Sequence, residues 1–251
     1  MEIRKLNAAR GWLWIKHGYQ LIMHNPLMSI TFALLCGLVM FGALNVPQVG
    51  PLIVVLLIPV LIAGYMRICR ALEEEEEIEL ARLFEGFQKH LIPLVALGGY
   101  TLLGMMIIAI AMIIIGGDAL TTLLESVKST DDPQILADAM LTSGSGVAFS
   151  LMVGFSLAFM LMLALQYAPM LVLFSSMRPF AALRASLSGS LRNFIPYTVY
   201  SLIMQVVALA LGMLPFGIGL IVLLPLGLTS LYVSYRNIFP FAGEIPPTQP
   251  D

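Results

Sequence analysis

The 251 residues are too apolar for a soluble domain. Hydrophobic residues make up 59% of the chain and charged residues 11%, and the mean hydropathy is +0.92, whereas soluble domains carry roughly 25% charged residues. The formal net charge of -2 argues against a nucleic-acid binder, because such proteins cluster positive charge on one face. The composition therefore predicts an all-α integral membrane protein.

The first 25 residues predict a helix that lies on the membrane surface. This stretch carries four lysines and arginines and is too polar to cross a bilayer. It is not a signal peptide, because the apolar run that begins at Leu27 is followed by no cleavage site. Trp12 and Trp14 favour the headgroup layer, and the Lys16 side chain can reach lipid phosphates from there. We expect these three residues to contact lipid.

Two apolar runs, at 27–45 and 51–68, predict the first membrane hairpin. A bilayer core about 30 Å thick needs roughly 20 apolar residues per helix, and both runs approach that length. The residues from Asn45 to Pro51 predict a tight polar turn, and Arg67 and Arg70 mark the return to the charged side.

Two further hairpins follow. The second spans 91–115 and 147–174 and is joined by an external loop at 116–146, in which Asp131-Asp132-Pro133 predicts the start of a short helix that ends at Met140. The third spans 194–213 and 217–236. We thus expect one polytopic membrane domain over 1–240 with six transmembrane helices, and a disordered cytoplasmic tail over 241–251.

A short pattern recurs ahead of each hairpin. Segments 18–26, 86–93 and 189–196 each run from a glycine to a proline that opens a long apolar stretch. Amphipathic segments precede them, so the sequence predicts three repeated hairpins, each after an interfacial amphipathic helix. Lys89 and Arg192, near the ends of the second and third of these helices, join the residues expected to contact lipid.

Five consecutive glutamates occupy positions 73–77. We interpret this run as the solvated start of the second amphipathic helix, where like charges repel unless they are screened. A dock for a basic partner and a collector of divalent cations remain the alternatives.

The lysines and arginines fall almost entirely on one side of the expected spans. Of the 13, Lys128 alone lies in the external loop. The positive-inside rule then places both termini in the cytoplasm and the chain in the bacterial inner membrane. Acidic residues such as the glutamate run weigh little in that rule.

Few polar or helix-breaking residues lie inside the spans. Pro59, Pro169 and Pro225 interrupt the returning helices, and Gln166 and Gln205 are the exceptional polar side chains. We interpret all five as packing residues, with the glutamines as interhelical hydrogen-bond partners. The alternative is a ligand cavity between the hairpins, which would make the protein a passive small-molecule or lipid transporter.

No catalytic motif emerges from the sequence. His24 and His90 precede two of the spans without metal-ligand spacing, and an interfacial lipid-modifying enzyme that uses them is the weakest interpretation. Cys36 and Cys69 are expected as buried free thiols. Ladders of small residues, such as Ser150, Gly154 and Ala158, predict close helix contacts. We expect no enzyme activity, no cofactor and no bound metal.

Four segments carry a wider pattern: Ala9 to Ile15, Asn25-Pro26, Ala63 to Arg67, and Ala181 to Pro196. They resemble a family of proteobacterial-type inner-membrane proteins with six spans and no assigned function. More loosely, the plan of amphipathic helix and hairpin is similar to the membrane portion of some glycerophosphodiester phosphodiesterases. Their catalytic domain is missing here, so the resemblance implies no activity.

Together these observations predict a non-enzymatic inner-membrane protein that acts through helix packing. Its expected partners are membrane lipids and either another membrane protein or a second copy of itself. Envelope maintenance and a subunit role in a membrane complex are the roles this would suit.

Overall fold

The computed structural model describes residues 3–75, 90–129, 132, 134, 144–213 and 218–241. Helices account for nearly all of these residues, and no strand occurs among them. The chain divides into two compact units. The larger comprises Met1–Gly99 and Ala164–Asp251, and the smaller comprises Tyr100–Leu163.

The larger unit begins with three helices whose ends follow from local chemistry. Helix α1 covers Arg10–His24, α2 covers Pro26–Leu44 and α3 covers Gly50–Glu73. The Asn25 side chain caps α2 by accepting a hydrogen bond from Met28 N at 3.2 Å, and Pro26 suits the first helical position because it needs no backbone partner there. The expected membrane-surface segment is therefore helical, and the first two apolar runs are helices within a few residues of the expected bounds.

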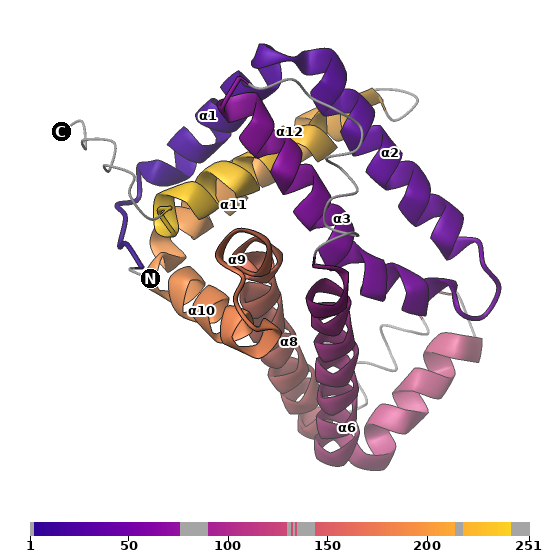
Figure 1. Ribbon diagram of the computed structural model, residues 1–251. Coiled ribbons are helices and arrows are strands. Elements are labelled where there is room, and N and C mark those ends of the chain that lie inside the picture. The colour runs from indigo at the N-terminus through magenta and orange to yellow at the C-terminus, as the bar shows by residue number, and fades with distance from the viewer. Residues whose placement is uncertain are drawn as a thin grey trace. The chain divides into compact units, whose positions relative to one another are not determined.

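The larger unit also holds the start of α6, which begins at Leu91, and four C-terminal helices. These are α9 (Ala168–Ser175), α10 (Pro179–Arg192), α11 (Phe194–Gly212) and α12 (Ile218–Ile238). Figure 1 shows α12, in yellow, running beside the indigo α1.

Helix α1 packs directly against α11 and α12. A side-chain carbon at Gly11 would lie 2.8 Å from Tyr200 N, and one at Gly18 would lie 2.6 Å from Ser230 Oγ. Distances that short leave no room for a Cβ atom. The two glycines therefore let the backbone of α1 approach α11 and α12 closely. Helix α1 is thus part of the helical core of its unit, in addition to any contact with a membrane surface.

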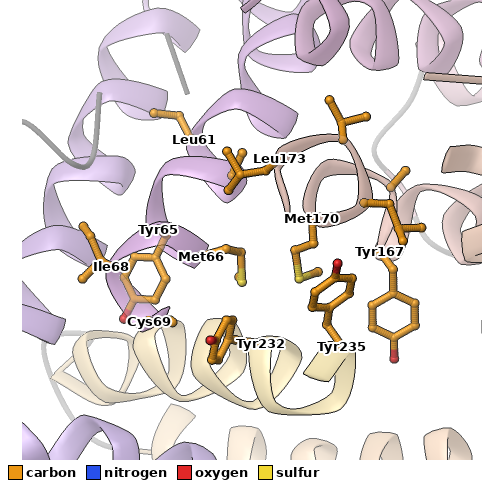
Figure 2. Close-up of a cluster of buried hydrophobic side chains, with 14 of the residues drawn as sticks. Leu61, Tyr65, Met66, Ile68, Cys69, Tyr167, Met170, Leu173, Tyr232 and Tyr235 are labelled. Carbon is orange, nitrogen blue, oxygen red and sulfur yellow. The ribbon is translucent and has the colours of Figure 1, made fainter. Parts of the chain in front are cut away.

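Side chains from α3, α9 and α12 form the core of the larger unit. Tyr65 and Met66 come from α3, Met170 from α9, and Tyr232 and Tyr235 from α12 (Figure 2). All five are at most 1% exposed. The Tyr65 hydroxyl donates to Ser29 O at 3.2 Å, which ties α2 to the same core and satisfies a buried polar group.

The smaller unit contains most of α6 (Leu91–Ser129) and of α8 (Gly144–Gln166). Gly117, with φ 56° and ψ -148°, breaks α6 into two parts, in a conformation that only glycine adopts without strain. The Ser150 hydroxyl donates to Met112 O at 2.7 Å, and a side-chain carbon at Gly154 would lie 2.7 Å from Met112 Cγ. The small residues predicted to make a close helix contact do so at Ser150 and Gly154.

Five helical segments are long and apolar enough to cross a membrane among the residues that the structure describes. They are Pro26–Leu44, Gly50–Glu73, Leu91–Glu125, Gly144–Ser175 and Phe194–Gly212. The all-α, membrane-type fold is therefore confirmed. The sixth expected span, 217–236, coincides with α12, which does not meet the same criterion within its described part. Its Thr229, Ser230 and Ser234 are buried.

The expected span at 147–174 lies within the apolar helical segment Gly144–Ser175. That segment has a break at Tyr167, where α8 ends and α9 begins, because Pro169, expected to interrupt this helix, lacks the amide hydrogen that a continuous helix would need. One expected boundary was wrong. The first part of the expected 116–146 loop is helical, because α6 resumes after Gly117 and runs to Ser129.

Several expectations lie outside the described residues. They concern the amphipathic helix before α6 with Lys89, the short helix from Asp131 to Met140, the turn at 214–216 and the tail from 242 onward.

Candidate functional site

The candidate functional surface is the apolar exterior of the long helices. In the most apolar stretches of α6 and α11 only 6% of the residues are buried, compared with 56% in α3. The large exposed side chains of these two helices include Leu103, Met105, Met106, Ile107, Ile110, Ile113, Ile114, Leu202, Val206 and Leu209. Exposed apolar side chains gathered on one helix, as on α6 and on α11 taken separately, mark a candidate contact surface for lipid or for another protein.

The residues expected to contact lipid separate into two groups. Trp12 is 53% exposed, and Lys16 and Arg192 are also exposed, so all three are available to headgroups. Trp14 is not, because it is fully buried and its ring packs edge-on against Tyr200 at a centroid distance of 6.0 Å. The expectation of lipid contact was wrong for Trp14, since the face of α1 that carries it turns toward α11.

The outward face of α1 carries the positive charge of this region. Burial, followed by the nearby charges of Lys16 and Arg10, lowers the pKa of His17 from its ordinary value of 6.5. His17 is therefore neutral at pH 7, and the cationic groups on this face are Lys16 and Arg10. Such a face suits contact with anionic lipid phosphates.

The five candidate cavity or packing residues differ in burial. Pro59, Pro169 and Pro225 are buried, whereas Gln205 is exposed on α11. Gln166 is partly buried, and its Oε1 atom has no hydrogen-bond partner among the described residues. Gln205 therefore lies on the surface of its unit, whereas the three prolines lie inside.

Asn193, at the junction of α10 and α11, fixes the N-terminal segment. Its Oδ1 accepts from Leu6 N at 2.8 Å, and its Nδ2 donates to Arg4 O at 2.8 Å and Gly189 O at 3.0 Å. Arg4 N also donates to Ile238 O at 3.1 Å. Residues 3–6 therefore join the start of α11 to the end of α12. Sequence analysis missed this role, although Asn193 stands in the recurring segment 189–196.

A second feature that the sequence did not predict is a charged aromatic cluster at the ends of α3 and α12. Arg70 and Arg236 both lie over the Phe241 ring, at 4.2 and 4.6 Å from its centroid. Arg236 Nη1 lies 3.3 Å from Glu73 Oε2, and Arg70 Nη2 lies 2.6 Å from Glu74 Oε1. The spacing of Arg70 and Glu74 was the signal available in the sequence.

This cluster corrects the interpretation of the glutamate run. Glu73 is the last residue of α3 and Glu74 is its C-cap, so the first two residues of the run belong to the end of a helix and not to the start of one. A carboxylate is unfavourable near the negative end of a helix dipole. The Tyr232 hydroxyl, which donates to Glu73 Oε2 at 2.5 Å, and the two arginines compensate for that placement.

The Asn193 contacts and the arginine–phenylalanine cluster hold chain segments in place. Within the described residues no cluster of His, Cys, Asp and Glu could hold a metal ion. Cys36 and Cys69 are free and buried, as expected. The two arginines hold Phe241, which follows α12, beside the end of α3. The apolar surfaces offer contact to lipid or to a helix.

Comparison with known proteins supports the membrane assignment. The chain is 27% identical over 274 aligned positions to a probable inner membrane protein of Burkholderia thailandensis, with 99% of both chains covered. No protein-family model and no solved structure matches, so the looser resemblance to the membrane portion of glycerophosphodiester phosphodiesterases finds no support. The chain has several long apolar helices and is similar over nearly its whole length to a probable bacterial inner membrane protein.

Proposed function

We propose that this protein is a non-enzymatic, multi-pass inner-membrane protein that acts through helix packing and through contacts with lipids or partner proteins. The observation that carries the proposal is the exposure of the long apolar helices. Ile107, Ile110 and Ile114 of α6 are 54%, 49% and 76% exposed. Exposing apolar surface to water costs a free energy of about 25 cal/mol per Å². Lipid hydrocarbon removes that cost.

The proposed topology has six spans in three hairpins with both termini in the cytoplasm. The sixth span is α12, whose polar residues are buried against neighbouring helices and so need not face lipid. The basic ends of α3 and α12, with Arg70 and Arg236, belong to one cluster and lie on one side, as the positive-inside rule requires. The roles that suit such a protein are envelope maintenance and membership of a membrane complex.

Reporter fusions test this topology. Alkaline phosphatase is active only outside the cytoplasm, and green fluorescent protein fluoresces only inside it when exported through the same route. We expect fluorescence for a fusion after Asp251 and phosphatase activity for fusions after Val46 and Glu125. An active phosphatase after Asp251, or recovery of the chain in the soluble fraction, would contradict the proposal.

The transporter alternative has no comparable support. It requires the three prolines and the two glutamines to line one cavity, and the exposure of Gln205 on α11 counts against that arrangement. No contact among the described residues favours it.

A further inference from the structure

The outer face of α11 carries a regular seam of side chains. Ile195, Leu202 and Leu209 recur every seven residues, and Thr198, Gln205 and Gly212 recur with the same period three residues later. All six are exposed. This is the spacing of the a and d positions through which two helices pack along their length, and helix pairs in membranes commonly cross at the same shallow angle.

Gln205, at the centre of the seam, is out of place against lipid. Thr198 satisfies its own hydroxyl by donating to Phe194 O at 2.9 Å. No hydrogen bond joins Gln205 to another residue in the described part of the chain. An amide carries two donors and an acceptor, and leaving them unpaired in hydrocarbon costs several kcal/mol. A membrane placement of α11 therefore requires a polar partner for Gln205.

The chemistry of the seam points to a second copy of this chain as that partner. All copies insert into the membrane in the same orientation, so two α11 helices meet in parallel with equal residues at equal depth. A carboxamide is self-complementary, because the donor of one can meet the acceptor of the other across a two-fold axis. Apolar Leu202 and Leu209 then face their own counterparts on either side.

Gly212 allows the helices to approach closely. A side-chain carbon at this glycine would meet no atom within 4 Å, so the protomer itself does not require a glycine there. Small residues at such places let helix backbones pack tightly in membranes. Gly212 is therefore not needed for packing inside the protomer, but it suits close packing between two protomers.

We propose that α11 forms the interface of a parallel homodimer, in which Gln205 of each protomer hydrogen-bonds to the same residue of the other. The proposal rests on the membrane placement proposed above and adds the partner and the surface. It gives the carboxamide of Gln205, the most polar side chain of the seam, a hydrogen-bond partner.

Cysteine cross-linking in native membranes tests the geometry. Single variants Leu202→Cys and Gln205→Cys on the seam are compared with Ala210→Cys, an exposed position beside it. The wild-type chain measures the background, because Cys36 and Cys69 are buried. We expect disulfide-linked dimers at 202 and 205 and only background at 210. Equal cross-linking at all three positions, or none at 202 and 205, overturns the proposal.

Fluorescence energy transfer between labelled full-length chains in lipid vesicles measures the affinity. We expect Gln205→Leu to raise the dimer dissociation constant by about threefold or more, and Gln205→Asn to retain more of the affinity. Gly212→Leu should dissociate the dimer, whereas Gly42→Leu should not. Gly42 is the matched control, since it is also an exposed helical glycine with open space around it.

Two failures are distinguishable. If the chain stays in the membrane fraction while Gly212→Leu and Gly42→Leu associate alike, the homodimer is overturned and the membrane function stands. If a different protein is cross-linked at the seam in place of a second copy, the homodimer is overturned as well. If the chain is absent from the membrane fraction, the proposed function fails together with the dimer.

Discussion

Helices α3 and α6 are both long enough and apolar enough to span a bilayer, yet they differ in what they touch. In their most apolar stretches, 56% of the residues of α3 are buried and only 6% of those of α6. Helix α3 places Ala63, Gly64 and Tyr65 against its neighbours, whereas Ile107, Ile110 and Ile114 of α6 point outward. Hydropathy thus predicts which segments enter a membrane, and small and aromatic residues determine which of them form the protein core.

The largest expected effect breaks this contrast at the core. Tyr65→Ala removes a fully buried ring and the hydrogen bond to Ser29 O, and should lower the free energy of unfolding by about 3 kcal/mol. Ile110→Ala on α6 is the control, and its side chain is 49% exposed. We expect that control to change stability by less than about 1 kcal/mol. Denaturant unfolding in mixed micelles measures both, and equal losses would show that α3 is no more a core helix than α6.

Glycine substitutions sharpen the contrast between close and open helix faces. Gly11→Val places a branched side chain against the backbone at Tyr200, and overpacking of this kind costs about 1–3 kcal/mol. Gly99→Val on α6 is the matched control, because a side-chain carbon there meets no atom within 4 Å. Thermal unfolding of the two variants in the same detergent should show a clear drop in Tm for Gly11→Val alone. A similar drop in both would contradict the close packing of α1.

Asn193→Ala tests whether the N-terminal segment is held in place. The substitution removes three hydrogen bonds and takes their side-chain partner from the part-buried Leu6 N and Arg4 O, for an expected loss of about 2 kcal/mol. Hydrogen exchange at Leu6 should become faster in this variant. Asn45→Ala is the control, since its side chain is exposed and bonds only to Phe41 O, and an equal rise in exchange at Leu6 in both variants would rule out the clamp.

The smallest expected effect concerns the end of α3. Phe241→Ala removes the ring that Arg70 and Arg236 share, and each cation–π contact is worth about 0.5–1 kcal/mol. We expect a loss of about 1 kcal/mol, measured by denaturant unfolding. A double variant with Arg70→Gln should lose less than the sum of the single losses, and strict additivity would show that the ring and the guanidinium do not interact.

Much of the fold followed from periodicity and length. The apolar runs predicted where α2, α3 and α11 begin and end to within a few residues, because each needs a fixed length of apolar chain. The break at Tyr167 was harder to place, since Pro169 could either kink a helix or end it. Helix α6 beyond Gly117 was missed because its polar residues resemble those of a loop.

The functional surface was predictable only in part. The sequence indicated that Trp12 and Lys16 lie on the surface, but the same aromatic signal also selected Trp14, which the structure buries. A helix face that lies on a membrane and a face that packs against another helix carry similar residues. Only the position of the neighbouring helix shows which of the two a given face is. The contacts of Asn193 and of Glu73 join residues more than 150 positions apart, and no local pattern encodes such pairs.

Labelling with a lipid-soluble carbene reagent tests the central claim most directly. The wild-type chain in lipid vesicles is photolysed, digested and mapped by mass spectrometry. We expect heavy labelling at residues 107–114 of α6 and little at residues 60–72 of α3. Equal labelling of the two segments, or protection of α6 from the lipid-phase reagent, would contradict it.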